Sequence, residues 1–152
     1  FDLIVSSPAL RTVKTAGIVA GLGRDNITDV VPLEMLCYGN PADGGDAKTL
    51  DQLFLEFEYS PLADYLSKGK DGEVISRAGL AAWQAVRNFA GRARADRVLA
   101  VGHAVLINAL GYEAVKQSDH RRIMADTSFG ECEGFTLEFD KNFDAAKLQL
   151  IQ

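Results

Sequence analysis

The sequence predicts an α/β fold with a mostly parallel central sheet and helices on both faces. Residues 3–5 and 98–101 form short, uninterrupted apolar runs, each followed by a tight turn and then by apolar residues at helical spacing. Between these two units, residues 73–95 carry a long amphipathic pattern that is typical of a helix packed on a sheet. Strands that alternate with helices along a chain favour a parallel sheet that helices cover on both sides.

The first unit is a strand at residues 3–5, the turn "SSP", and a helix whose apolar positions are Leu10, Val13, Ala16, Ile18 and Val19. This helix is expected to end near Gly21 and Gly23. Because these glycines follow a helix instead of opening one, they favour a C-terminal cap over a phosphate-binding loop.

The middle of the chain predicts a second β-rich run in "TDVVPLEML", ending near Pro32 and Leu33, and then a loop over residues 37–47 that is dense in Gly, Asn, Pro and Asp. Apolar residues at helical spacing follow in residues 50–57, and "SPLADYLSKGKDG" predicts a short capped helix and an exposed turn. In the helix over residues 73–95, Trp83 is expected to belong to the core. Residues 104–110 resume helical character, and β runs close the chain near residues 134–139 and 147–151.

Composition bounds the class of protein. With 152 residues, 47% of them hydrophobic, the chain has the size of a single domain spanning residues 1–152. The net charge of −5, with no stripe of Lys or Arg, argues against nucleic acid or an acidic membrane surface as partner. Two cysteines without ligand spacing argue against a zinc site or a disulfide framework, and favour a cytoplasmic protein. We find no apolar run long enough to span a bilayer and no leader pattern.

Arg11 is a cation near the start of a predicted helix. Ser7 is a good N-cap and Pro8 a good first helical residue, which puts Arg11 within or just past the first turn. A cation is disfavoured there because the free N–H groups carry partial positive charge, whereas a bound phosphate would be stabilised by both the helix end and the guanidinium. The alternative is that Arg11 reaches solvent or a surface carboxylate.

His103 follows the second apolar strand, just as Arg11 follows the first. Ligands of open α/β sheets bind at the carboxyl ends of the strands, so the two side chains should face a common space if their strands are neighbours. The alternative is that His103 is a buried histidine whose hydrogen bonds are satisfied within the core.

Glu34, before a glycine-rich loop, is a candidate proton donor if partial burial raises its pKa, or else an ordinary exposed carboxylate. His120 is expected to be solvent-exposed, and Arg121 and Arg122 are either the rim of an anion pocket or an ordinary surface patch.

Two stretches carry a resemblance to a known family. "FDLIVSSPALRTVKTA" resembles the strand-Ser-Pro-x-x-Arg-x-x-x-Thr-Ala segment of the histidine phosphatase superfamily, the phosphoglycerate mutase-like proteins, and "RVLAVGHAVLINAL" is similar to that family's second histidine motif. Their order and separation fit, and "CEGFTLEFD" is a looser match. The segment between Glu34 and His103 is short, which favours a compact type similar to the small phosphohistidine phosphatases over the mutase branch.

The resemblance implies a phosphatase that hydrolyses a phosphomonoester or phosphohistidine of a small substrate or phosphoprotein through a phosphohistidine intermediate, without metal or cofactor. Arg11 would clamp the phosphoryl group, His103 would stabilise its charge, Ser7 would lie in the supporting turn, and Glu34 would be a weakly matched acid. The family's nucleophile lies in an Arg-His-Gly motif upstream of the Ser-Pro segment, and no such motif occurs here. We therefore expect an N-terminal strand and its histidine to be missing from the sequence. The alternatives are a non-catalytic pseudophosphatase that binds phosphorylated ligands, and a mutase-type phosphotransferase.

Overall fold

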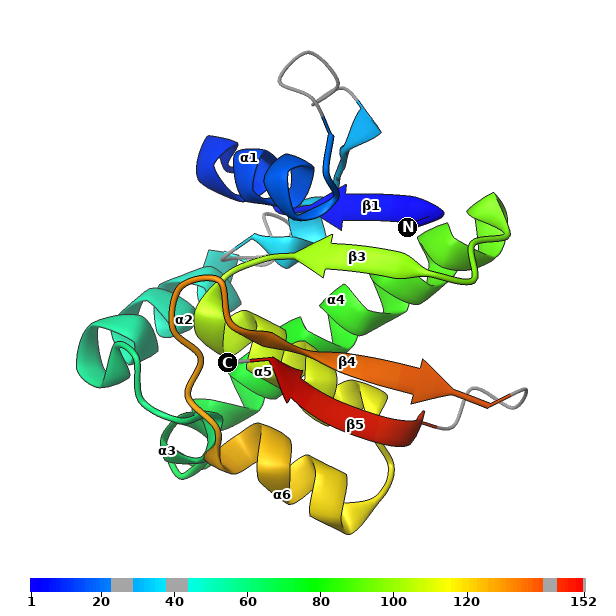
Figure 1. Ribbon diagram of the computed structural model, residues 1–152. Coiled ribbons are helices and arrows are strands. Elements are labelled where there is room, and N and C mark those ends of the chain that lie inside the picture. The colour runs from blue at the N-terminus through cyan, green and yellow to red at the C-terminus, as the bar shows by residue number, and fades with distance from the viewer. Residues whose placement is uncertain (23–28, 38–43, 141–144, 152) are drawn as a thin grey trace.

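The computed structural model describes residues 1–22, 29–37, 44–140 and 145–151 (Figure 1). The elements in chain order are β1 (Leu3–Ser6), α1 (Leu10–Val19), β2 (Val31–Pro32), the 3₁₀ helix η2 (Glu34–Leu36), α2 (Gly44–Phe57), α3 (Leu62–Leu66), α4 (Gly72–Ala93), β3 (Val98–Val101), α5 (Ala104–Ala114), α6 (Ser118–Asp126), β4 (Gly134–Phe139) and β5 (Ala145–Ile151).

The central sheet is parallel and has the strand order β2-β1-β3. Strand β1 pairs with both neighbours: Leu3 lies opposite Val98 and Ser6 opposite Val101, while Ser6 is also opposite Pro32. The predicted α/β fold with parallel strands is confirmed. Since β1 and β3 are adjacent and in register, the two turns that follow them lie at the same edge of the sheet.

The alternation of side chains along β1 and β3 places helices on both faces of the sheet. Ile4 and Leu99 pack on one face against α1, through its buried Ala16. Val5 and Ala100 pack on the opposite face in a cluster with residues of α4 and α5, including Val86. Apolar residues on both faces are what a sheet covered on both sides requires. Figure 1 shows α1 on one side of β1 and β3, and α4 and α5 on the other.

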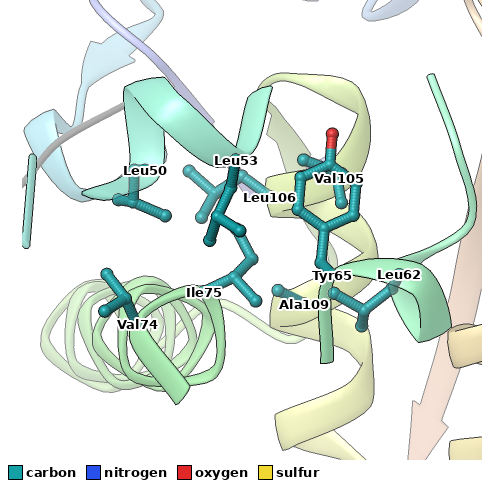
Figure 2. Packing of buried hydrophobic residues seen from close by; sticks show 9 residues of the cluster. All are labelled: Leu50, Leu53, Leu62, Tyr65, Val74, Ile75, Val105, Leu106 and Ala109. Atoms are coloured by element: carbon teal, nitrogen blue, oxygen red, sulfur yellow. The ribbon is translucent and has the colours of Figure 1, made fainter. Parts of the chain in front are cut away.

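A second cluster of buried residues anchors the start of α5 (Figure 2). It joins α2, α3, α4 and α5 through Leu50, Leu53, Leu62, Tyr65, Val74, Ile75, Val105, Leu106 and Ala109. Val105 and Leu106 come directly after the turn that contains His103 and are almost fully buried. The core therefore fixes the first turn of α5, the helix that directly follows His103.

Helices α4 and α5 cross in close contact at a glycine. A Cβ atom on Gly79 would lie 2.5 Å from the carbonyl carbon of Ala109 and 2.6 Å from its oxygen. These distances are well below van der Waals contact, so only a residue without a Cβ allows this approach. Gly79 thus sets how closely α5 packs on α4.

The last two strands form an antiparallel pair, β4-β5, separate from the parallel sheet. Phe135 of β4 packs in the same cluster as Val98 and Ala100 of β3, and Trp83 of α4 stacks on Phe139 with 5.1 Å between ring centroids. Both sheets therefore rest on the α4–α5 layer. Within the described residues, β1 is the one strand paired with β3, and β5 the one paired with β4.

Element boundaries agree with the sequence prediction in most places. Helix α1 ends as expected: Gly21 has a φ of 71°, and the N–H groups of Gly21 and Leu22 donate to the carbonyls of Ile18 and Gly17, which is a Schellman cap. The loop predicted over residues 37–47 is too long, because α2 already begins at Gly44. Residues 38–43 of that loop and Gly23 lie outside the described residues.

Candidate active site

Three side chains meet at the carboxyl ends of β1 and β3. The N–H of Ser7, just after β1, donates to the carbonyl of Val101 at the end of β3, at 2.8 Å, which joins the two turns. Arg11 is the second residue of α1, and His103 is the residue before α5, with extended backbone angles. Both helices begin at this edge, so their unpaired N–H groups and positive dipole ends point to the same region.

The His103 ring bridges Arg11 and Ser7. Arg11 Nη2 lies 3.0 Å from Nδ1 of the ring, and Ser7 Oγ lies 3.0 Å from Nε2. A guanidinium has only donors, so Nδ1 must accept and the proton of the neutral ring is assigned to Nε2, which donates to Ser7 Oγ. The expected proximity of Arg11 and His103 is confirmed, across 92 residues of chain.

The environment of His103 favours the neutral ring. The residue is buried, with 6% of its surface exposed. Burial, and next the positive charge of Arg11, lower the pKa of His103 below its usual value of 6.5. A neutral imidazole is the form that can accept the hydrogen bond from Arg11.

Arg11 itself is exposed. Within the described residues the guanidinium makes one hydrogen bond, from Nη2, so it retains donors on its other nitrogens. The first turn of α1 contains no acidic residue to balance it. A cation with no carboxylate partner among the described residues, beside two helix N-termini, is an arrangement that suits a small anion with several oxygens, such as phosphate.

Ser7 does not cap α1, in contrast to the local prediction. The N-cap is Ala9, without a side-chain hydrogen bond, and the helix begins at Leu10. Ser7 Oγ is 3.4 Å from the N–H of Ala9 but only 3.0 Å from His103. The fully buried Ser7 hydroxyl accepts the hydrogen bond from the imidazole N–H. Without this acceptor the buried N–H would be unpaired, at a cost of about 1–3 kcal/mol.

Thr12 supports the turn, and the sequence reasoning did not find this role. Its buried hydroxyl lies 2.8 Å from the carbonyl oxygen of Ser7 and 2.7 Å from that of Ala9. These contacts tie the turn after β1 to the first turn of α1. A threonine in the first turn of a helix, able to bond to carbonyls three to five residues back, is a signal that could have indicated it.

Glu34 begins η2, directly after β2, and so lies at the same edge of the sheet. It is exposed, and the partial burial on which the proton-donor prediction depended is not found. Among the described residues it has no hydrogen bond to Ser7, Arg11 or His103. The structure therefore brings three of the four predicted residues together and leaves Glu34 apart from their hydrogen bonds.

The remaining polar candidates lie on α6, which packs against α5 and α3. His120 is partly buried, so the expectation of an exposed side chain is wrong. Its Nδ1 atom is shielded and has no hydrogen-bond partner among the described residues. Arg121 interacts with Glu113 and with the ring of Tyr112, and Arg122 with Asp119. These contacts account for both arginines without an anion.

Two further observations concern the described part of the chain. It contains no group of three or more His, Cys, Asp or Glu side chains placed to hold a metal ion. Its helices are all too short or too polar to cross a lipid bilayer.

Comparison with known families decides the relationship. The model of the histidine phosphatase superfamily (branch 1) matches residues 1–142, which include both strand-turn-helix units and β4. The chain belongs to the histidine phosphatase superfamily. No curated protein sequence and no solved structure gave a significant match.

Membership of the histidine phosphatase superfamily supports a phosphatase or mutase-like function for the chain. It also agrees with the fold, a mixed α/β arrangement around a parallel sheet of the phosphoglycerate mutase-like kind. The motifs quoted from the sequence lie within the matched residues and carry Ser7, Arg11 and His103.

Proposed function

We propose that the protein is a phosphatase that hydrolyses a phosphomonoester or a phosphohistidine through a phosphohistidine intermediate. The observation that supports this most is the hydrogen bond of 3.0 Å between Arg11 and His103 at the carboxyl ends of two parallel strands. In this proposal Arg11 binds the phosphoryl oxygens through its remaining donors, and His103 stabilises the charge that develops on them. Such positioning and electrostatic stabilisation supply most of the rate in phosphoryl transfer.

The attacking histidine is proposed to come from outside residues 1–152. The chain has two histidines. Both ring nitrogens of His103 are engaged by Ser7 and Arg11, and His120 lies on α6. The proposed reaction needs neither metal nor cofactor, and its substrate is a small phosphorylated molecule or a phosphoprotein in the cytoplasm.

Anion binding by the chain tests the site. We expect inorganic phosphate to shift the NMR signals of Arg11 and His103, and Arg11→Ala to weaken its binding about 10-fold to 100-fold, because a hydrogen bond to a charged group contributes about 1.5–3 kcal/mol. Lys14→Ala is the matched control: it removes an exposed cation from the same helix and should leave binding unchanged. Equal binding by Arg11→Ala and the wild type would refute the site.

Turnover tests the reaction. We expect the complete gene product to hydrolyse an aryl phosphate or a phosphohistidine protein, and Arg11→Ala or His103→Ala to reduce kcat by about 10²–10³-fold each, as the loss of one charge-stabilising donor does. A phosphotransferase would instead pass the phosphoryl group to a second substrate in place of water. Unchanged turnover in both variants would refute the assignment.

A second candidate function is a pseudophosphatase, which holds a phosphorylated ligand without cleaving it. The observation in its favour is that the sequence contains no Arg-His-Gly. Arg11-dependent phosphate binding by a complete gene product that shows no turnover would favour this candidate over the enzyme.

A further inference from the structure

Ser7 is a fully buried side chain whose hydroxyl makes a specific contact with the candidate site. The backbone N–H of Ser7 donates to β3 and so holds the turn in place. The side-chain Oγ of the same residue faces the ring of His103. The ring lies between a fixed oxygen at Nε2 and a long, exposed side chain at Nδ1. Ser7 is therefore the more rigid of the two hydrogen-bond partners of the ring.

The hydrogen-bond pattern has a chemical consequence for an anion. Nδ1 carries a lone pair that accepts from Arg11 Nη2. An anion that draws Nη2 into its own contacts would bring one of its oxygens to that lone pair. Two electron-rich atoms repel each other unless a proton lies between them. A tetrahedral dianion can therefore share Arg11 and His103 only if Nδ1 becomes a donor.

We propose that Ser7 is the positioning residue for His103: by accepting Nε2–H it directs Nδ1 to the anion held by Arg11, and Nδ1 takes up one proton from solvent as the anion binds. This inference rests on the proposed phosphate site. The proton comes from water, forms an N–H bond at Nδ1, and returns to water when the anion leaves. His103 then donates from both ring nitrogens, to Ser7 Oγ and to the anion. The hydrogen bond that Nδ1 accepted from Arg11 Nη2 is given up in this step, and Nη2 donates to the anion instead.

The charged groups around the ring agree with this step. From α1, Arg11 faces the ring and disfavours its protonation before an anion arrives. Glu34 of η2, at the same edge of the sheet, is exposed and makes no hydrogen bond to the ring among the described residues. An anion that neutralises Arg11 would remove the opposing charge and add an attractive one.

The test is an NMR titration of the two histidines with sulfate, which remains a dianion between pH 5 and 9 and so contributes no proton of its own. We expect saturating sulfate to raise the pKa of His103 by about one unit, and sulfate to bind several-fold more tightly at pH 5.5 than at pH 8, because the linkage is reciprocal and a shift of one unit changes the affinity by at most about tenfold. His120 is the internal reference, and His103→Asn assigns the signals and should remove the pH dependence.

Two adjacent serines supply matched variants. Ser6 and Ser7 are both fully buried, but Ser6 Oγ donates to the carbonyl of Ser7 and makes no hydrogen bond to the ring among the described residues. We expect Ser7→Ala to weaken sulfate binding about tenfold and to reduce the sulfate-induced change in the His103 titration. Ser6→Ala should leave both as in the wild type.

The outcomes separate the inference from the proposed function. Arg11-dependent sulfate binding without any change in the His103 titration would overturn the proton uptake and leave the anion site intact. Equal effects of Ser7→Ala and Ser6→Ala would overturn the positioning role of Ser7. Absence of any Arg11-dependent binding of sulfate or phosphate would overturn the inference and the proposed function together. The wild-type titration decides the proton uptake even if Ser7→Ala fails to fold.

Discussion

Replacing Gly79 with alanine should test how the α4–α5 crossing supports the site. The new Cβ would lie 2.5, 2.6 and 2.7 Å from the carbonyl carbon, oxygen and Cβ of Ala109. Carbon atoms pack best about 3.5–4.0 Å apart, so the two helices would have to separate by about 1 Å. Two of the three contacted atoms are backbone atoms of a helix and cannot rotate away. Overpacking of this kind costs about 1–3 kcal/mol.

The same helix provides the control. A Cβ on Gly91 would meet nothing within 4 Å, and this glycine is exposed. Gly91→Ala should therefore stabilise the protein by up to about 1 kcal/mol, through helix propensity alone. The free energies of unfolding, measured in urea, should place Gly79→Ala below the wild type and Gly91→Ala at or above it. In thermal unfolding, each kcal/mol corresponds to about 2–4 °C for a chain of this length.

The effect should extend to the candidate site. Ala109 lies on the helix that begins after His103, so a displaced α5 would move the imidazole relative to Arg11. We expect Gly79→Ala to weaken phosphate binding as well as to lower stability. A Gly79→Ala protein as stable as Gly91→Ala would refute the close packing on which this reasoning rests.

Two further perturbations follow from the structure. The pKa of His103 is lowered in the folded protein, so below pH 6.5 this histidine binds more protons in the unfolded chain than in the folded one. The free energy of unfolding should therefore fall as the pH falls, by at most about 1.4 kcal/mol per pH unit, until the folded histidine itself titrates. Urea titrations between pH 5 and 8 should show a smaller slope for His103→Asn. Asn108 is buried and donates Nδ2–H to the carbonyls of Met124 (3.3 Å) and Thr127 (2.8 Å), so Asn108→Ala should cost about 1–3 kcal/mol, and a variant as stable as the wild type would show that water replaces the amide.

The parts of the fold that the sequence predicted well are those that local patterns encode. Helix α1, its glycine cap and strand β3 were expected within a residue or two, because apolar periodicity and a glycine at positive φ are properties of short segments. The meeting of Arg11 and His103 was also expected, since side chains at the ends of neighbouring parallel strands share an edge.

The features that the sequence could not predict depend on distant partners. Ser7 has the pattern of an N-cap, but its hydroxyl is hydrogen-bonded to His103, which lies 96 residues away in the chain. A rule based on neighbouring residues cannot predict such a distant partner. The exposure of Glu34 and the partial burial of His120 depend on how η2 and α6 pack, which periodicity does not specify. The pairing of β4 with β5, apart from the parallel strands, likewise depends on tertiary contacts.

The pairing of β1 with β3 also determines when the site can form during folding. Arg11 and His103 are 92 residues apart in the chain, and closing a loop of that length costs about 4 kcal/mol in its length-dependent term. Contacts that span so much of a chain slow folding, and during synthesis they must wait until β3 has been made. The α4–α5 pair is local by comparison and can form first. The anion site is thus among the last features to form, and a phosphate that binds there stabilises only chains that have completed the fold.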